Sequence, residues 1–216
     1  SLCGMPGRYS SFRGLIGALT LAVATPAAGA DTPQAQTLSF FIEAPRDLIA
    51  LTHGGAVALR MQPPGIAPLR EPPVTNALAL TSVLRDGAGR IVGLATELED
   101  FPPAPPADGE PVWDTYWTVM IVGRGALLLH EKESLGPTVG RIFREAAAEG
   151  RAWTGAHTEP STVGPLPGRN GKIVGGTGVF SGATGAFREI GTLRRLSAEG
   201  QIEATIELRL ELLQPS

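Results

Sequence analysis

The chain has 216 residues, of which 43% are apolar and 18% are charged, so it is long enough and apolar enough for one domain with a well-buried core. The formal net charge is −3 and Lys and Arg form no dense cluster, which argues against nucleic acid as a partner. Twenty-eight Gly and 19 Pro indicate many turns and few long helices, and therefore favour an all-β fold.

The first thirty residues have the pattern of a secretory signal peptide. Arg8 and Arg13 precede the apolar run LIGALTLAVA at 15–24, and the small residues AGA follow at 28–30. This run is too short to span a hydrocarbon core, which takes about 20 residues. We therefore expect cleavage after Ala30, no membrane insertion after signal removal, and a secreted or periplasmic protein.

Residues 31–216 contain no cysteine, because the single cysteine of the chain is Cys3. Disulfides and thiolate ligands are therefore excluded from this part of the chain. The histidines, His53, His130 and His157, are isolated and have no spacing typical of a zinc site. We therefore expect no metal site of the thiolate or histidine type.

Eight segments in which apolar and polar residues alternate, or in which β-branched residues gather, are separated by turn residues. The last one, IEATIELRLEL, is the clearest, since every second residue is apolar and one face is therefore dry. Eight antiparallel strands of this kind close most readily into a barrel that can hold a small ligand. The segments are 37–43, 77–84, 90–99, 114–122, 126–132, 171–176, 185–195 and 202–212.

Other segments do not fit this series of strands. The segment 101–111, FPPAPPADGEP, is predicted to be an extended loop because of its prolines, and 154–170 is also predicted to be a loop. A short helix is predicted from Arg141 to Glu149, with Gly150 as its stop signal. A further strand at 56–61 is one interpretation of that part of the chain.

The glycine-rich segment KIVGGTGVFSGATGAF at 172–187 has two interpretations. A phosphate-binding loop requires a helix after the glycines and either a later acidic residue or a Gly-Lys-Ser/Thr motif. The alternation that follows Gly185 instead favours a β-hairpin that binds no nucleotide, with Thr177 at the turn and Phe180 against the end of the barrel. The residues expected to shape this hairpin are Gly175, Gly176, Thr177, Gly178, Gly182 and Gly185.

This hairpin resembles the one found in the allene oxide cyclase barrel superfamily, which includes plant allene oxide cyclases and dirigent proteins. LALTSVLRDGAGRIVGLATELE at 78–99 and WDTYWTVMIVGRGALLLHE at 113–131 resemble other strands of that family, in the same order. The resemblance implies one barrel domain over 31–216 and chemistry without a cofactor. It also implies a small apolar or phenolic ligand and a homo-oligomer, often a trimer.

The resemblance also suggests which residues form a site. Glu43 resembles an acid on the first strand of the cyclases, Glu99 stands where the cyclases have a cysteine, and Ser82 stands where the family has an asparagine. Glu97 belongs to the same acid-rich candidate pocket. The expected catalytic residues are Glu43 and Glu99, and the expected substrate-binding residues are Ser82, Asp114, Tyr116 and Trp117.

The direction in which Glu97 and Glu99 point has two interpretations. Leu94 and Leu98 lie on the opposite face of their strand, and if these bulkier apolar residues form the core, the two acids face water. The resemblance places the acids inside. At 113–118 the alternation likewise leaves either two indoles, or a phenol with a carboxylate, in the interior.

Two functions remain open. The chain is either a cofactor-independent cyclase or isomerase with a glutamate as general acid, or a non-catalytic carrier or interaction module that uses the same cavity. A buried acid with a raised pKa would favour the enzyme. An interior lined by Leu, Val and Trp alone would favour the carrier.

Overall fold

The computed structural model describes residues 34–52, 61, 65, 67–102 and 110–214. The predicted signal peptide, most of the predicted strand at 56–61 and most of the proline-rich loop lie outside these residues. Within the described part of the chain, no helix has the length and apolar character needed to cross a membrane.

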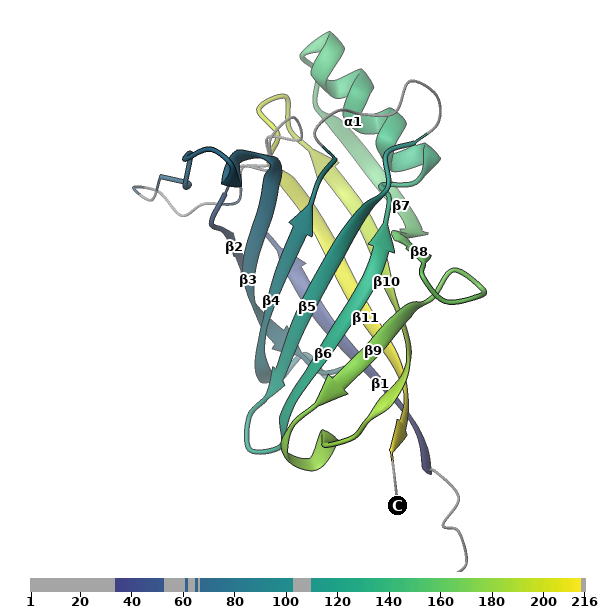
Figure 1. Cartoon of the computed structure of the whole chain (residues 1–216). Coiled ribbons are helices and arrows are strands. Elements are labelled where there is room, and N and C mark those ends of the chain that lie inside the picture. Colours follow the sequence, from purple (N-terminus) through teal and green to yellow (C-terminus); the bar gives the residue numbers. More distant parts are fainter. Residues whose placement is uncertain (1–33, 53–60, 62–64, 66, 103–109, 215–216) are drawn as a thin grey trace, which may run out of the picture. The chain divides into compact units, whose positions relative to one another are not determined.

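Eight antiparallel strands close into a barrel (Figure 1). The hydrogen-bonded order is β1-β11-β10-β9-β6-β5-β4-β3, and a pairing between Phe41 and Arg85 joins β3 to β1. The predicted all-β eight-stranded barrel is therefore confirmed, and its closure covers the strand edges. The strands are β1 (Gln34–Ala44), β3 (Ala77–Arg85), β4 (Ile91–Asp100), β5 (Trp113–Ile121), β6 (Gly125–Glu133), β9 (Gly171–Gly176), β10 (Thr184–Leu196) and β11 (Ile202–Gln214).

Three short strands add to the barrel. They are β2 (Leu48–Ala50), β7 (Trp153–Pro160) and β8 (Thr162–Gly164), which pair with β3, β10 and β6 respectively. The prediction of a loop over 154–170 is therefore wrong for β7 and β8. The sequence of β7 is mostly polar and its side chains are largely exposed, so backbone pairing to β10 holds it in place rather than an apolar face.

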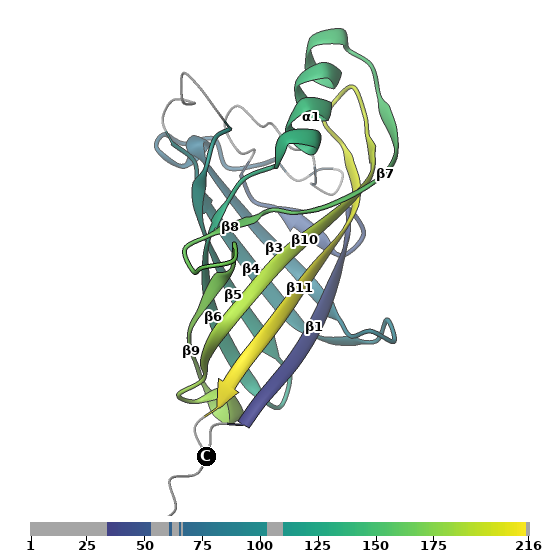
Figure 2. The same cartoon turned by 90° about the vertical axis from the view of Figure 1, so that its right-hand side faces the viewer.

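The helix α1 (Pro137–Glu149) lies at one end of the barrel, and Figures 1 and 2 show it at the same end from two sides. It starts four residues before the predicted Arg141, because Pro137 fits the first turn of a helix. Gly150 ends it in the left-handed conformation, as predicted. Val139 and Phe143 line the cavity at the barrel end, so α1 forms part of that cavity's wall.

The glycine-rich segment forms the predicted hairpin. β9 and β10 are antiparallel, and they pair over Gly185–Phe187. The connection contains one 3₁₀ turn, Gly178–Phe180, which is too short for the helix of a nucleotide-binding loop, and Phe180 is fully buried. Thr177 donates its backbone N–H to the carbonyl of Ala126 at 2.8 Å, which ties the turn to β6. That the hairpin binds no nucleotide stays a prediction.

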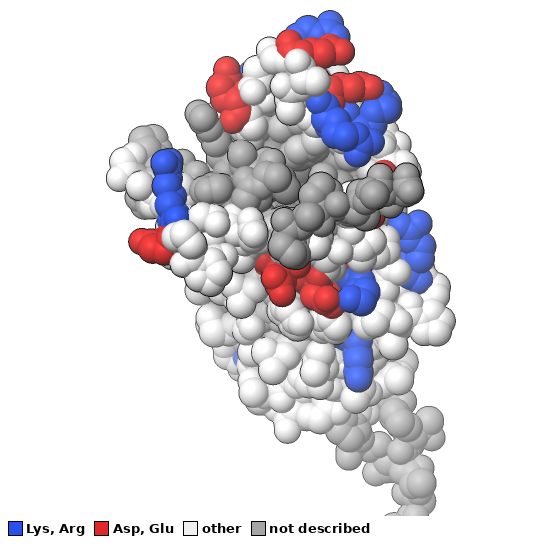
Figure 3. All heavy atoms as spheres, turned by 45° about the horizontal axis from the view of Figure 1, so that its top comes forward, with Lys and Arg blue, Asp and Glu red and all other residues white. Residues whose placement is uncertain are grey.

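The outer wall of the barrel carries large apolar side chains. Five of them are between 41% and 55% exposed, namely Leu94 and Leu98 of β4, Met120 of β5, Leu128 of β6 and Val174 of β9. Much of the wall that Figure 3 shows beneath the α1 end is accordingly free of charged side chains. Because the larger apolar residues of β4 face out, the smaller and acidic residues of this strand face in.

Candidate functional site

Five glutamates point into the barrel interior from three strands. Glu97 and Glu99 lie on β4, Glu131 and Glu133 on β6, and Glu189 on β10, and none is more than 8% exposed. Glu97 and Glu99 therefore face inward, as the resemblance implies, and the interpretation that placed them in water is wrong. We call these five residues the glutamate cluster.

The glutamate cluster contains two sets of three residues, and within each set the carboxylate oxygens lie within 4.8 Å of one another. One set is Glu97, Glu99 and Glu133, and the other is Glu131, Glu133 and Glu189. Because Glu133 belongs to both, the five groups are one continuous cluster. Like charges this close cannot all be ionised, unless a cation binds between them.

Each glutamate of β6 accepts hydrogen bonds from one indole N–H and one hydroxyl. These donors are neutral, so they orient the carboxyl groups without supplying a positive charge. The inward-facing residues of β5 are thus the two indoles rather than the phenol and the carboxylate. The bonds run from Trp117 Nε1 (3.2 Å) and Thr162 Oγ1 to Glu131, and from Trp113 Nε1 (3.2 Å) and Thr115 Oγ1 (2.7 Å) to Glu133.

The cluster has raised pKa values. Burial is the main reason why the pKa of Glu131 is raised to about 8, and the charge of Glu133 acts in the same direction, whereas the hydrogen bonds from Thr162 and Trp117 lower it. Burial, followed by repulsion from the other glutamates, also raises the pKa of Glu97, Glu99, Glu133 and Glu189 well above the ordinary value. Carboxyl groups of this kind keep protons at neutral pH, and can donate a hydrogen bond or a proton.

A cavity of about 140 Å³ lies beside the cluster at the α1 end of the barrel. Glu97, Glu99, Glu133 and Glu189 reach it, and the described residues that line it include no Lys, Arg or His. The rest of its wall is mainly apolar, so the carboxyl groups sit at one side of a dry space. Among the apolar lining residues are Leu80, Phe101, Trp113, Phe143, Leu193 and Ile206.

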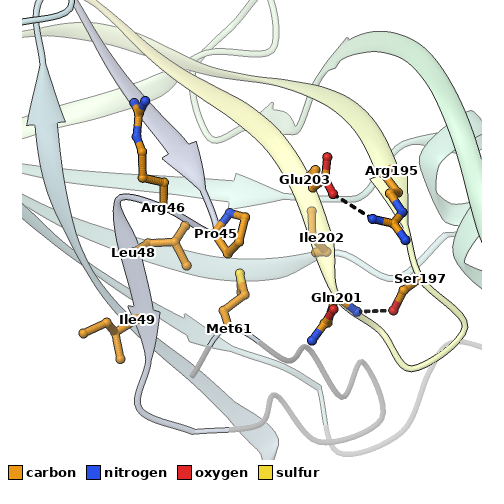
Figure 4. Close-up of a pocket in the computed structure, with 10 residues that line it drawn as sticks. All are labelled: Pro45, Arg46, Leu48, Ile49, Met61, Arg195, Ser197, Gln201, Ile202 and Glu203. Carbon is orange, nitrogen blue, oxygen red and sulfur yellow. Dashed lines mark hydrogen bonds and ion pairs between the residues drawn. The ribbon is translucent and has the colours of Figure 1, made fainter. Parts of the chain in front are cut away.

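A larger recess of about 540 Å³ adjoins the cavity near β2 (Figure 4). Leu48, Met61 and Ile202 line both spaces. On one side of the recess Arg195 of β10 points toward Glu203 on the neighbouring strand β11 and pairs with it at 3.0 Å, and both side chains are about half exposed. Exposed charges that already form an ion pair are screened by water and interact only weakly with a ligand. We therefore take the smaller interior cavity as the candidate site.

Glu43, expected to be catalytic, does not reach this site. Phe40, Ile42 and Ala44 are the inward residues of β1, so Glu43 lies on the outer face. There it pairs with Arg194 at 2.6 Å. The expectation that Glu43 belongs to the pocket is therefore wrong, because the alternation of β1 points it away.

Asp114 and Tyr116 also lie outside the barrel, although both were expected in the pocket. Asp114 accepts hydrogen bonds from His130 at 2.8 Å and from Lys132 at 3.0 Å, and His130 stacks on the ring of Tyr116. The two residues form a polar group on the outer surface of β5 and β6. Their expected placement in the pocket is wrong, because Trp113 and Trp117, which are four residues apart, occupy the inner face of β5.

Ser82 and Trp117 face the interior, as expected for ligand-binding residues, but neither lines the cavity. Trp117 is bound to Glu131. Ser82 is buried in β3, and its hydroxyl has no hydrogen-bond partner among the described residues. Whether either side chain contacts a ligand stays a prediction.

Sequence reasoning missed Glu131, Glu133 and Glu189. The signal was present in β6, where Leu127, Leu129 and the two glutamates occupy alternate positions and so share one face. Extending the alternation of the buried leucines to the end of the strand would have placed both acids inside.

No family model matches the chain, and no curated protein matches it. Solved structures do match. Two pterocarpan synthase dirigent proteins each share 13% identity with the chain. The first matches with a TM-score of 0.42 over 92% of this chain and 100% of its own. The second matches with a TM-score of 0.43 over 86% of this chain and 98% of its own. The Diels Alderase AbmU from Streptomyces koyangensis shares 9%, with a TM-score of 0.36 over 85% of this chain and 71% of its own. Scores this low carry no inference about function, which must come from the residues of the site.

Proposed function

We propose that the barrel binds a small, mostly apolar molecule in its interior cavity and acts on it as a cofactor-independent cyclase or isomerase. The observation that carries this proposal is the glutamate cluster, whose buried carboxyl groups keep protons at neutral pH beside an apolar wall. A cavity lined by apolar residues alone would instead favour a carrier. Secretion and a homo-oligomer, often a trimer in the family it resembles, stay predictions.

Glu99 is the general acid in this proposal. It lines the cavity and is the most exposed member of the cluster, at 8%. Burial raises its pKa, and the charges of Glu133 and Glu189 add to this effect. A protonated Glu99 can therefore give its proton to an oxygen of the ligand, which general acids must do near the operating pH.

The proton must return before the product of an isomerisation leaves. After the transfer Glu99 is a carboxylate, and it accepts a proton back from the rearranged ligand, so the step needs no outside acid or base. Glu133 lies within 4.8 Å of Glu99, carboxylate oxygen to carboxylate oxygen, so the protonated Glu133 can stabilise that carboxylate by sharing its own proton with it. The apolar wall excludes water from the developing cation and fixes the ligand's shape, which is how a site without a cofactor favours one product.

Substituting Glu99 should stop proton transfer without closing the cavity. Suitable probes are two neutral epoxides whose rings open when the oxygen is protonated and which can then isomerise to allylic alcohols, cyclohexene oxide and cyclopentene oxide. The rate at which the wild-type chain consumes the better probe is expected to fall about 10²–10⁴-fold in Glu99→Gln, the usual contribution of a general acid. Gas chromatography measures consumption, and quenching of tryptophan fluorescence by cyclohexanone reports binding next to Trp113.

Glu43→Gln is the matched control, since it makes the same chemical change on the outer face of the barrel. Its rate is expected to equal that of the wild type. If the wild type binds cyclohexanone but accelerates neither probe, the carrier is the better function. If cyclohexanone does not bind at all, the cavity is not a ligand site.

A further inference from the structure

The titratable side chains among the described residues that line the cavity are all acidic. Carboxyl groups enter or adjoin it from four strands, whereas the described part of its lining supplies no basic side chain. His157 of β7 lies 3.2 Å from Glu159, Nε2 to Oε2. The acidic groups that face the space are Glu97 and Glu99 from β4, Glu133 from β6, Glu159 from β7 and Glu189 from β10, with Glu131 behind them.

One oxygen of the cluster has no hydrogen bond of ordinary geometry among the described residues. It is Oε2 of Glu189, which is 5% exposed, although the side chains of Ser161 and Trp117 lie close enough to lower the pKa of Glu189. Both glutamates of β6 have indole and hydroxyl donors, so this oxygen is where an incoming donor would be accepted. A buried acceptor left without a donor costs free energy, which a ligand N–H recovers.

Aromatic rings line the same space. Phe101 and Trp113 line the cavity with their ring centroids 5.0 Å apart, and Phe143 of α1 lines it as well. Aromatic faces beside carboxylates attract organic cations, and an apolar wall favours a hydrocarbon body. The carboxylates of the cluster would repel the negative charge of an ionised carboxylic acid, so such a ligand is disfavoured.

Building on the proposed function, we propose that the ligand is an aliphatic amine. Its ammonium group is hydrogen-bonded to Glu189 and the adjacent carboxylates, and its hydrocarbon body lies on the apolar wall. A hydrated divalent cation is the rival occupant, because two sets of three carboxylates have suitable spacing. The apolar wall offers such a cation no further oxygen ligands, and therefore favours the amine.

Binding of the amine exchanges a proton. The ligand is an ammonium ion below its own pKa, about 10.4 if it resembles lysine, and the carboxyl group that receives it must be ionised. A protonated cluster therefore releases one proton to solvent for each ammonium bound. The affinity for the amine should rise with pH between 6 and 8, by at most about tenfold per unit, whereas the affinity for a neutral ligand should not rise.

Three compounds of one shape test this inference with the full chain. Calorimetric titration at pH 6 and pH 8 compares cyclohexylamine, cyclohexanol and cyclohexanecarboxylate, and calcium chloride is titrated separately. At pH 8, we expect cyclohexylamine to bind at least about tenfold more tightly than cyclohexanol. This difference in affinity should be smaller at pH 6. Glu189→Gln should remove most of the difference, and Glu43→Gln should leave it unchanged. Glu97→Gln provides a second cluster variant should Glu189→Gln fail to fold.

The remaining outcomes separate this inference from the proposed function. If cyclohexanol or the carboxylate binds as tightly as the amine, the amine inference is wrong, although the cavity still binds ligands. If calcium binds and displaces the amine, the cluster is a metal site. If no compound binds, the amine inference and the proposed function both fail.

Discussion

The barrel is expected to lose stability as the pH rises from about 5 to about 8. Between the ordinary pKa of 4.5 and the raised pKa of about 8, Glu131 is protonated in the folded chain and ionised in the unfolded chain. The folded state then binds more protons, so the free energy of unfolding falls with increasing pH, by about 1.4 kcal/mol per pH unit for each such group. Urea denaturation at pH 5, 6, 7 and 8 measures this slope.

Glu97→Gln should flatten that slope. Glu97 is 2% exposed, its pKa is raised chiefly by burial, and glutamine replaces the neutral acid with a neutral group of the same shape. Stability at pH 8 should therefore rise while stability at pH 5 stays close to that of the wild type. Glu145→Gln, on the exposed side of α1, is the matched control and should keep the wild-type slope.

A second acid does not disturb this test. Asp47 accepts hydrogen bonds from Arg85, which hold the pKa of Asp47 well below its usual range. Its contribution to the free energy of unfolding is present above the ordinary pKa and is lost only as the pH falls below about 4.

A free energy of unfolding that stays constant or increases from pH 5 to pH 8 would contradict the prediction. It would show that the glutamates of the cluster are ionised in the folded chain.

Gly185→Ala is expected to destabilise the barrel by more than about 3 kcal/mol. Gly185 has a φ of 139°, and a methyl group there would overlap the backbone carbonyl of Glu211 on the paired strand β11. Both the strained backbone and the overlap oppose alanine, and the two strands would have to separate locally. Urea denaturation at pH 5 gives the loss.

Gly175→Ala is the matched control in the same hairpin. Its φ is not in the left-handed region, and nothing lies within 4 Å of the added methyl group. Stability should change by no more than about 0.5 kcal/mol. Equal losses in the two variants would mean that the close approach of β10 to β11 is not what requires glycine at 185.

The strands of the barrel could be predicted because alternation alone marks them. β9 was predicted with its observed ends, and the other seven to within two or three residues at each end. β7 could not be predicted in this way, since a polar segment held by backbone pairing to β10 has no apolar face to mark it.

The phase of a strand was harder to predict than its existence. Burial of the larger apolar side chains is a sound rule for a barrel with a filled interior. For β4 this rule gives the wrong prediction, because Leu94 and Leu98 lie on the outer wall while the inner face carries acids beside a cavity. Only the resemblance placed Glu99 inside, and the same resemblance misplaced Glu43.

An NMR titration of glutamate carboxyl carbons labelled with carbon-13 measures directly whether the glutamate cluster holds protons at neutral pH. Resonances assigned with Glu99→Gln and with the other single glutamine variants would give the pKa of each member of the cluster. We expect a pKa of about 8 for Glu131, and a pKa well above 4.5 for Glu99, whose resonance should respond to cyclohexanone. Ordinary values near 4.5 for both groups would contradict the proposed general acid, because the barrel would then hold no proton donor at neutral pH.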